Sequence, residues 1–408
     1  MAIFSRFKST VFFLFLVFSS CKGQHKQQEM TNDEAMALAQ PAIVVAANRT
    51  EAYLPLLEGK KVGVVANATS VVFHEKGHTH LVDSLISRGI AVQKVFAPEH
   101  GFRGTADAGE HVKDGMDAKT GVPIISLYGD NRKPSQDQLE NLDVIVFDIQ
   151  DVGVRFYTYI ATLQLVMEAC AEHHTPIIVL DRPNPNGHYI DGPTMLPEHT
   201  SYLGMNTIPL VYGMTMGEYA KMLNGEGWLE NGGKAYLTVI QLENYTHQSE
   251  YHLPIRPSPN LPNDVSINLY PSLGLFEGTN VNAGRGTEFQ FQRYGASFLD
   301  STKNDFRYVP EPNFGSKYPK EEGKTCYGKD LSNTPRMNEM TLRWVMEAYA
   351  NCLDKSKFFL TSGFTKHAGT PLLQQQIEEG LTEAEIKATW QNELEAFKQI
   401  RKNYLLYD

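Results

Sequence analysis

The chain has 408 residues, of which 42% are hydrophobic and 21% are charged, and its formal net charge is −10. This length exceeds one ordinary hydrophobic core and predicts two domains, and the composition is typical of a globular protein. The acidic balance argues against nucleic acid as a partner, because phosphate binding requires a basic face.

The N-terminus has the pattern of an export signal. Arg6 and Lys8 precede an apolar run at residues 11–18, which is too short to span a bilayer, and Cys21 follows closely. The pattern is similar to a bacterial lipoprotein signal, in which Cys21 becomes the lipidated first residue; a plain secretory signal is the alternative. We therefore expect a signal peptide at 1–21, a flexible tether at 22–45, and an exported protein anchored to a membrane of the cell envelope, facing the periplasm or the cell surface.

Apolar runs alternate with helical patterns from about residue 60 onwards. Such alternation predicts βαβ units and an α/β domain with a mostly parallel sheet covered by helices, which we place at residues 46–252. The predicted strands are 61–66, 91–96, 123–127, 143–147, 176–180 and 235–242. The predicted helices are 80–88, 160–173 and 216–224.

Residues 253–408 are predicted to form a second, smaller domain that completes the site. Its first segment, 253–271, is rich in proline, which suits a structured crossing between domains better than a regular element. Near the C-terminus, Thr382 and Glu385 have the spacing of a capping box, and apolar residues recur at helical spacing from Ile386 to Ile400. We expect this last helix to pack on the second domain.

Two polar clusters follow two of the predicted strands. Glu99, His100 and Arg103 come after the strand 91–96, and Asp148 and Asp151 come after the strand 143–147. Because ligands of open α/β sheets bind at the carboxyl ends of the strands, we expect the two clusters to form one site.

Glu99 is the candidate general acid. It lies in a turn between Pro98 and Gly101, where a carboxylic acid can be partly withdrawn from water, which suits proton donation near neutral pH. The alternative is that Glu99 pairs with Arg103 and only holds the loop.

Three further carboxylates are candidates for a second catalytic role. Asp148 and Asp151 lie at the next strand end, and Glu277 lies in the second domain, in a glycine-rich stretch that also contains Asn280 and Arg285. Glycine allows backbone to approach a ligand closely. The alternative is a tight turn in which the arginine caps carbonyl groups.

No sequence pattern calls for a cofactor or a metal. No Gly-x-Gly-x-x-Gly follows the first strand, and neither a Gly-Lys-Thr phosphate loop nor a Gly-x-Ser-x-Gly elbow occurs. A nucleotide-sugar or other cofactor enzyme on the same fold is therefore disfavoured. Paired acids near His100 would suit a metal, but no ligand spacing accompanies them, and we expect none.

Several segments together resemble the exo-β-N-acetylmuramidase family of peptidoglycan hydrolases, long known as a domain of unknown function. The resemblance covers the chain from about residue 55 to its end. It implies a Rossmann-like N-terminal domain, a smaller α+β C-terminal domain, and a cleft between them where N-acetylmuramic acid is removed from the non-reducing end of peptidoglycan fragments. The matching segments are 96–104, 120–123, 126–129, 147–153, 155–159, 180–185, 257–260, 277–280, 284–287 and 368–370.

The resemblance also implies roles for individual residues. Glu99 would protonate the leaving oxygen, and Asp148, Asp151 or Glu277 would activate water, stabilise the oxocarbenium-like state or attack directly; attack by the sugar's own 2-acetamido group is the other route. The lactyl carboxylate of muramic acid requires a cation, and among Arg103, Arg155 and Arg285 we favour Arg155. The substrate-binding set is Asn67, His100, Arg103, Arg155, Tyr157, Asn280 and Arg285. A lipoprotein that binds muropeptides without cleaving them is the competing function.

Overall fold

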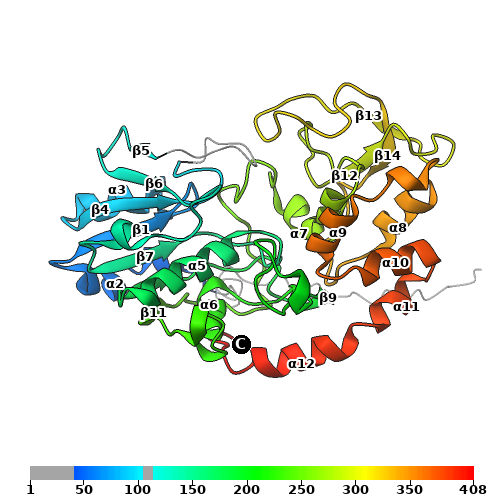
Figure 1. Ribbon diagram of the computed structural model, residues 1–408. Coiled ribbons are helices and arrows are strands. Elements are labelled where there is room, and N and C mark those ends of the chain that lie inside the picture. The colour runs from blue at the N-terminus through cyan, green and yellow to red at the C-terminus, as the bar shows by residue number, and fades with distance from the viewer. Residues whose placement is uncertain (1–40, 104–113) are drawn as a thin grey trace, which may run out of the picture. The chain divides into compact units, whose positions relative to one another are not determined.

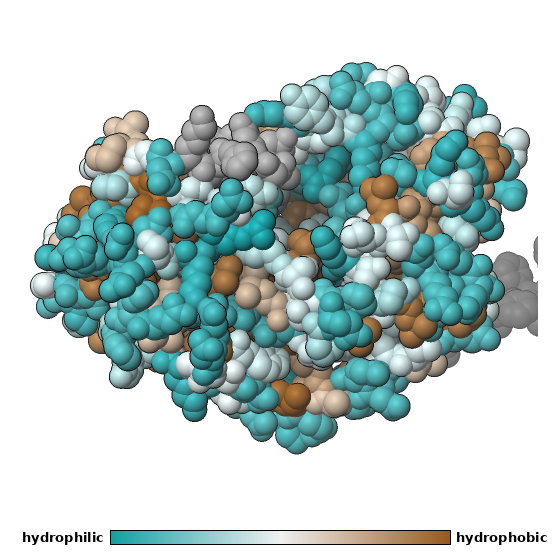
Figure 2. All heavy atoms as spheres, in the orientation of Figure 1, coloured by the Kyte–Doolittle hydropathy of each residue, from teal (hydrophilic) through white to brown (hydrophobic). Residues whose placement is uncertain are grey.

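The computed structural model describes residues 41–103 and 114–408, and residues 42–408 form one compact unit. The predicted signal peptide, Cys21 and nearly all of the predicted tether lie outside the described residues. Within the described ranges no helix is long and apolar enough to cross a bilayer. On the face drawn in Figure 2, hydrophobic residues are scattered among hydrophilic ones. The division into domains after residue 252 stays a prediction.

A seven-stranded sheet forms the N-terminal part of the unit (Figure 1). Its order is β11-β8-β7-β1-β4-β6-β5, and every neighbouring pair is parallel except β5 and β6. Without the edge strand β5, this is the Rossmann order 3-2-1-4-5-6. The strands are β1 (Lys61–Ala66), β4 (Ala91–Ala97), β5 (Gly115–Met116), β6 (Pro123–Ser126), β7 (Val144–Asp148), β8 (Ile177–Leu180) and β11 (Leu237–Ile240).

Helices cover both faces of this sheet because its central strands are apolar on both sides. In β7, Ile145 and Phe147 join one hydrophobic core, whereas Val144 and Val146 join the other. Helices α5 (Tyr159–Glu172) and α6 (Met216–Gly225) pack in the first core, and α2 (Thr50–Leu57) and α3 (Leu81–Ser87) pack in the second. The predicted α/β class and its strands and helices are confirmed, with ends that shift by up to two residues.

Short elements complete the N-terminal part. They are η1 (Ala46–Asn48), the hairpin of β2 (Val71–His74) and β3 (Gly77–His80), α4 (Gln136–Leu139), the antiparallel pair β9 (Asp191–Thr194) and β10 (Pro209–Val211), η2 (Pro197–His199) and η3 (Glu230–Gly232).

The smaller C-terminal part contains an antiparallel sheet of order β12-β14-β13 with helices around it (Figure 1). Its strands are β12 (Arg293–Ala296), β13 (Phe306–Tyr308) and β14 (Cys326–Asp330). Its helices are α7 (Asp264–Leu273), η4 (Gly274–Gly278), α8 (Arg343–Ala350), η5 (Lys355–Lys357), α9 (Thr361–Ala368), α10 (Leu372–Glu379), α11 (Glu383–Ala388) and α12 (Gln391–Arg401). This arrangement confirms the predicted α+β domain.

The proline-rich segment is only partly irregular, so the prediction for 253–271 is wrong at its end. Helix α7 starts at Asp264 behind an Asn263 capping box and continues through Pro271. Proline cannot donate to the carbonyl four residues earlier. That carbonyl, on Ile267, accepts a hydrogen bond from Asn186 Nδ2 at 3.0 Å instead. A side chain from the N-terminal part therefore makes the helical proline tolerable.

The predicted C-terminal helix is two helices, and its second half returns to the N-terminal part. The Thr382–Glu385 capping box starts α11 as expected. Beyond α12, Tyr404 donates to Glu226 at 2.6 Å and the backbone N–H of Leu406 donates to Glu218 at 2.8 Å. Figure 1 shows the chain end beside α6. Helix α12 itself contacts β9 and β10, so the expectation that this helix packs on the second domain is wrong for its second half.

Candidate active site

The site lies where the strand order of the sheet reverses, at the carboxyl ends of β1, β4 and β7. The loops after β1 and β7 are joined directly, because Gln150 donates its backbone N–H to Thr69 Oγ1 at 3.0 Å. The turn after β4 is closed by Gly101 N–H donating to Pro98 O at 3.0 Å. His100 within it has φ 70°, a left-handed conformation that is unfavourable for a non-glycine residue.

Two hydroxyl groups donate hydrogen bonds to the side chain of Glu99. The distances are 3.5 Å from Tyr128 to Oε1 and 3.2 Å from Thr158 Oγ1 to Oε2, and Tyr159 donates to the Glu99 carbonyl at 3.3 Å. Burial and the Glu99 charge raise the pKa of Tyr128 to about 12, so this phenol remains a donor at neutral pH. Two separate segments, the loop after β6 and the start of α5, therefore hold the acid in place.

Glu99 lines a pocket, here the Glu99 pocket, whose wall combines aromatic rings with polar side chains. Tyr157 and Tyr270 meet edge to face with ring centroids 6.0 Å apart, and Phe291 meets Tyr270 at 4.7 Å. The Tyr157 hydroxyl donates to the Pro257 carbonyl at 2.6 Å. The lining residues are Glu99 and His100, then 156–159, Ser258, Asn260, Leu261, Tyr270, Arg285 and Phe291. Aromatic faces beside a carboxyl group suit a sugar ring, which carries both C–H faces and hydroxyls.

A second pocket, here the Phe314 pocket, adjoins the first. The two share His100, Tyr159 and Ser258. His100 Nε2 lies 3.2 Å from Ser258 Oγ, which connects the turn after β4 to the proline-rich segment. Asn67, predicted as a ligand-binding residue, lines this second pocket rather than the first.

The cation of the Glu99 pocket is Arg285. Its Nε and Nη2 donate to Glu277 at 3.2 and 3.0 Å, and the buried Lys320 ammonium donates to the carbonyls of Phe276, Glu277 and Thr279. Burial alone would raise the pKa of Glu277, but the charges of Arg285 and Lys320 outweigh it and hold that pKa below its ordinary value. Arg285 and Lys320 thus both act on the Glu277 carboxylate, and Arg285 also lines the pocket that contains Glu99.

Arg155, which the sequence favoured as the carboxylate-binding cation, has a different role. Its side chain is 0% exposed, and it donates to the carbonyls of Pro193, Ile208, His367 and Ala368 at 2.7–3.0 Å. A Cβ on Gly369 would lie 2.6 Å from Arg155 Nη2, so this position must be glycine. With its donors directed to carbonyls inside the protein, Arg155 is not placed to bind a substrate carboxylate.

The two aspartates after β7 are also interior. Asp148 is 0% exposed and forms a two-fold hydrogen-bonded ion pair with Arg182, at 2.6 and 2.9 Å. Asp151 is 3% exposed and accepts from Tyr212 and from the Gly153 N–H. Neither aspartate is among the residues that line the Glu99 pocket. The segment after β7 is buried, and the first of its residues to line the pocket is Phe156.

Two other predicted residues also lie elsewhere. Arg103 pairs with Asp83 at 3.0 Å and Asp117 at 2.7 Å and lines a third pocket, so the alternative of a Glu99–Arg103 pair is wrong. The Asn280 amide donates to the Lys357 carbonyl at 2.7 Å. Among the described residues no group of three His, Cys, Asp or Glu side chains is arranged to hold a metal ion.

Sequence reasoning missed several residues of the site. Thr158, Ser258 and Asn260 lie in the segments that carried the resemblance, so a signal existed for them. Phe314 stands in a loop without regular pattern, and no sequence signal pointed to it.

A glutamic acid at the carboxyl edge of a Rossmann-like sheet shares one aromatic pocket with a guanidinium from a smaller α+β domain. Fold and site together define a two-part α/β enzyme with an acid and a cation in a single pocket. Comparison with known proteins agrees. The family models for the exo-β-N-acetylmuramidase NamZ match this chain, the N-terminal model at residues 62–265 and the C-terminal model at 268–407.

Individual relatives extend the likeness over most of the chain. A peptidoglycan β-N-acetylmuramidase NamZ of Bacillus subtilis is 37% identical over 374 residues, which cover 87% of this chain and 89% of the relative. Crystal structures of two DUF1343 family proteins of Bacteroides fragilis match with TM-scores of 0.82 and 0.76, at 42% and 27% identity. Each covers 90% of this chain and 99% of the other. The chain belongs to the NamZ exo-β-N-acetylmuramidase family, which confirms the predicted family and makes the protein a glycosidase.

Proposed function

We propose that the protein removes N-acetylmuramic acid from the non-reducing end of peptidoglycan fragments, with Glu99 as the general acid. The observation that supports this role is the placement of Glu99: hydroxyls of Tyr128 and Thr158 hold its carboxyl group in a pocket with aromatic walls. Family membership supports the substrate class. In the reaction, Glu99 gives its proton to the glycosidic oxygen as the bond from that oxygen to the sugar's C1 breaks. Water supplies the new hydroxyl at C1 and loses its second proton to a base.

We assign the lactyl carboxylate of the sugar to Arg285. Arg285 lines the same pocket as Glu99, and its guanidinium can form charge-assisted hydrogen bonds with the carboxylate of an anionic sugar. Arg103 is neutralised by two aspartates, and Arg155 is buried against carbonyls. Arg285 is therefore the candidate of the three that lines the same pocket as the acid.

The second catalytic role falls to Glu277 or to the substrate's own 2-acetamido group. Glu277 stays ionised near neutral pH, because its neighbouring cations lower its pKa, and it can stabilise positive charge that develops on the sugar. Asp148 and Asp151 do not fit this role, since both are buried with partners inside the protein. The Glu277 side chain is 24% exposed and pairs with Arg285, which lines the pocket. The configuration of the first-formed sugar, read by proton NMR, separates a retaining from an inverting course.

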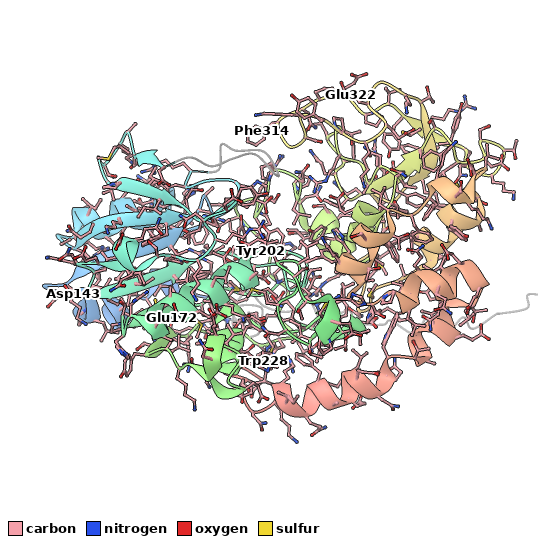
Figure 3. All side chains as sticks on the ribbon, viewed as in Figure 1. Asp143, Glu172, Tyr202, Trp228, Phe314 and Glu322 are labelled. Carbon is pink, nitrogen blue, oxygen red and sulfur yellow. The ribbon has the colours of Figure 1, made fainter. Side chains whose placement is uncertain are left out.

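The test is the release of free sugar. The purified protein without residues 1–40 is incubated with the disaccharide MurNAc-β-1,4-GlcNAc, and MurNAc is measured by mass spectrometry. Glu99→Gln should lower turnover by about a hundredfold or more, because proton donation to the leaving oxygen is lost. Glu322→Gln makes the same chemical change at an exposed residue, labelled in Figure 3, and should leave turnover unchanged.

Two outcomes would oppose the proposal. Near-native turnover by Glu99→Gln would remove Glu99 from the role of acid. Binding of the disaccharide by the unaltered protein without release of sugar would favour the muropeptide-binding alternative.

We also propose export and lipid anchoring at Cys21, supported by the sequence pattern of residues 6–21. In a bacterial host, the full chain should incorporate radioactive palmitate and sediment with membranes. Cys21→Ser should abolish the label, and a labelled Cys21→Ser chain would contradict the anchor.

A further inference from the structure

Phe314 is a large apolar side chain that the structure leaves exposed at the edge of the site. It is 65% exposed and lies in the loop between β13 and β14. Figure 3 shows it at the side of this loop that is turned toward the sheet. It lines the Phe314 pocket together with Asn67 from the end of β1 and Pro257 from the proline-rich segment. Both domains therefore contribute to the surface around this ring.

The turn that carries Phe314 is anchored. Asn313 and Ser316 pair as an antiparallel bridge around it, with backbone hydrogen bonds of 2.9 and 3.2 Å. The amide of Asn260 donates to the Gly315 carbonyl at 2.6 Å, and the Asn313 amide donates to the Thr287 carbonyl at 3.1 Å. The ring is thus held at a defined place next to a residue, Asn260, that itself lines the Glu99 pocket.

The two pockets are contiguous, because His100, Tyr159 and Ser258 form part of both. When the glycosidic oxygen of a bound sugar lies at Glu99, the nearest neighbouring pocket for the group attached to that oxygen is the Phe314 pocket, which adjoins at His100, Tyr159 and Ser258. The Phe314 pocket is lined by Phe314 and the prolines Pro257 and Pro259 together with polar residues, among them Thr69. That combination suits a pyranose, which presents apolar C–H faces and a polar rim.

We propose that Phe314 stacks on the sugar that leaves, a 2-acetamido hexose, and makes the protein prefer saccharide leaving groups to small alcohols. This inference rests on the proposed hydrolase function and deepens it. Stacking on an exposed ring buries apolar area and orients the leaving sugar while the glycosidic oxygen is protonated. The sugar bound at Glu99 does not need this contact, because its own pocket supplies separate aromatic walls.

The experiment compares two substrates that share the sugar bound at Glu99. They are the disaccharide MurNAc-β-1,4-GlcNAc and methyl β-MurNAc, whose methyl group is too small to stack. Phe314→Ala should lower the ratio of kcat/KM for the disaccharide to kcat/KM for the methyl glycoside about tenfold, which corresponds to the loss of one stacking contact. Phe314→Trp should restore the ratio. Tyr318→Ala changes an aromatic residue of the same loop that is 89% exposed and should leave both activities unchanged.

While the unaltered protein is active, an unchanged ratio in Phe314→Ala would overturn the inference, whether the variant keeps both activities or lowers both equally. Failure of the proposed function would look different, because the unaltered protein would then release sugar from neither substrate.

Discussion

Thr158 occupies the N-cap position of helix α5, yet its hydroxyl donates to Glu99 Oε2 at 3.2 Å. An N-cap threonine ordinarily accepts from a backbone N–H of its own helix, and Thr158 makes no such bond. The start of α5 therefore lacks the usual side-chain cap, and its threonine hydroxyl contacts the Glu99 carboxyl group.

Thr158→Val removes the hydroxyl and keeps the branched shape. We expect kcat to fall about tenfold with KM nearly unchanged, because one hydrogen bond that orients the acid is lost while the pocket wall remains. Thr158→Ser should restore most of kcat. Steady-state kinetics on the disaccharide measures both, and an unchanged kcat in Thr158→Val would show that the bond does not position Glu99.

Arg285→Gln should weaken binding of free N-acetylmuramic acid about tenfold or more, measured by calorimetry, and leave any weak binding of N-acetylglucosamine unchanged. The reason is that only the first sugar carries the carboxylate that a guanidinium binds. Because the single change leaves Glu277 without its partner, the double variant with Glu277→Gln serves as a charge-balanced control. Undiminished affinity for the acidic sugar in both variants would contradict the assignment.

Asp151→Asn should alter how stability depends on pH. Burial raises the pKa of Asp151 from near 3.8 to about 7, against the opposing effect of hydrogen bonds from Tyr212 and Gly153. A group with a raised folded-state pKa contributes its full stability below the unfolded pKa and loses it as the pH rises through the folded one. Relative to Asp151→Asn, the unaltered protein should therefore lose free energy of unfolding between about pH 4 and pH 7. Urea titrations at several pH values test this, and parallel curves would refute it.

Arg155→Met should lower the free energy of unfolding by about 3 kcal/mol or more, because four buried carbonyls lose their donors. Arg155→Lys should be nearly as destabilising, since an ammonium cannot reach all four. Chemical denaturation gives the values. If Arg155→Lys keeps the stability of the unaltered protein and only its KM rises, the result would show that Arg155 binds the substrate.

Much of the fold follows from local pattern. The predicted strands agree with β1, β4, β6, β7, β8 and β11 because each is a short apolar run between breaks, and such runs bury both faces of a parallel sheet. Helix α7 was not predicted, because it contains Pro271. The carbonyl that this proline leaves without a helical donor is bound by Asn186, which lies far away along the chain.

The sequence by itself determined that Glu99 lies at a strand end and in a turn, since both follow from neighbouring residues. Only the tertiary structure decided which arginine accompanies it. Arg103, Arg155 and Arg285 all lie in segments that carry the family resemblance, but the oxygens that each one contacts are set by the folded chain. Arg285 pairs with Glu277, eight positions away, whereas Arg155 contacts oxygens from distant parts of the chain. Two of the carbonyls that bind Arg155 are 212 and 213 positions away. A guanidinium is directed by whichever oxygens surround it once the chain has folded, and local sequence does not carry that information.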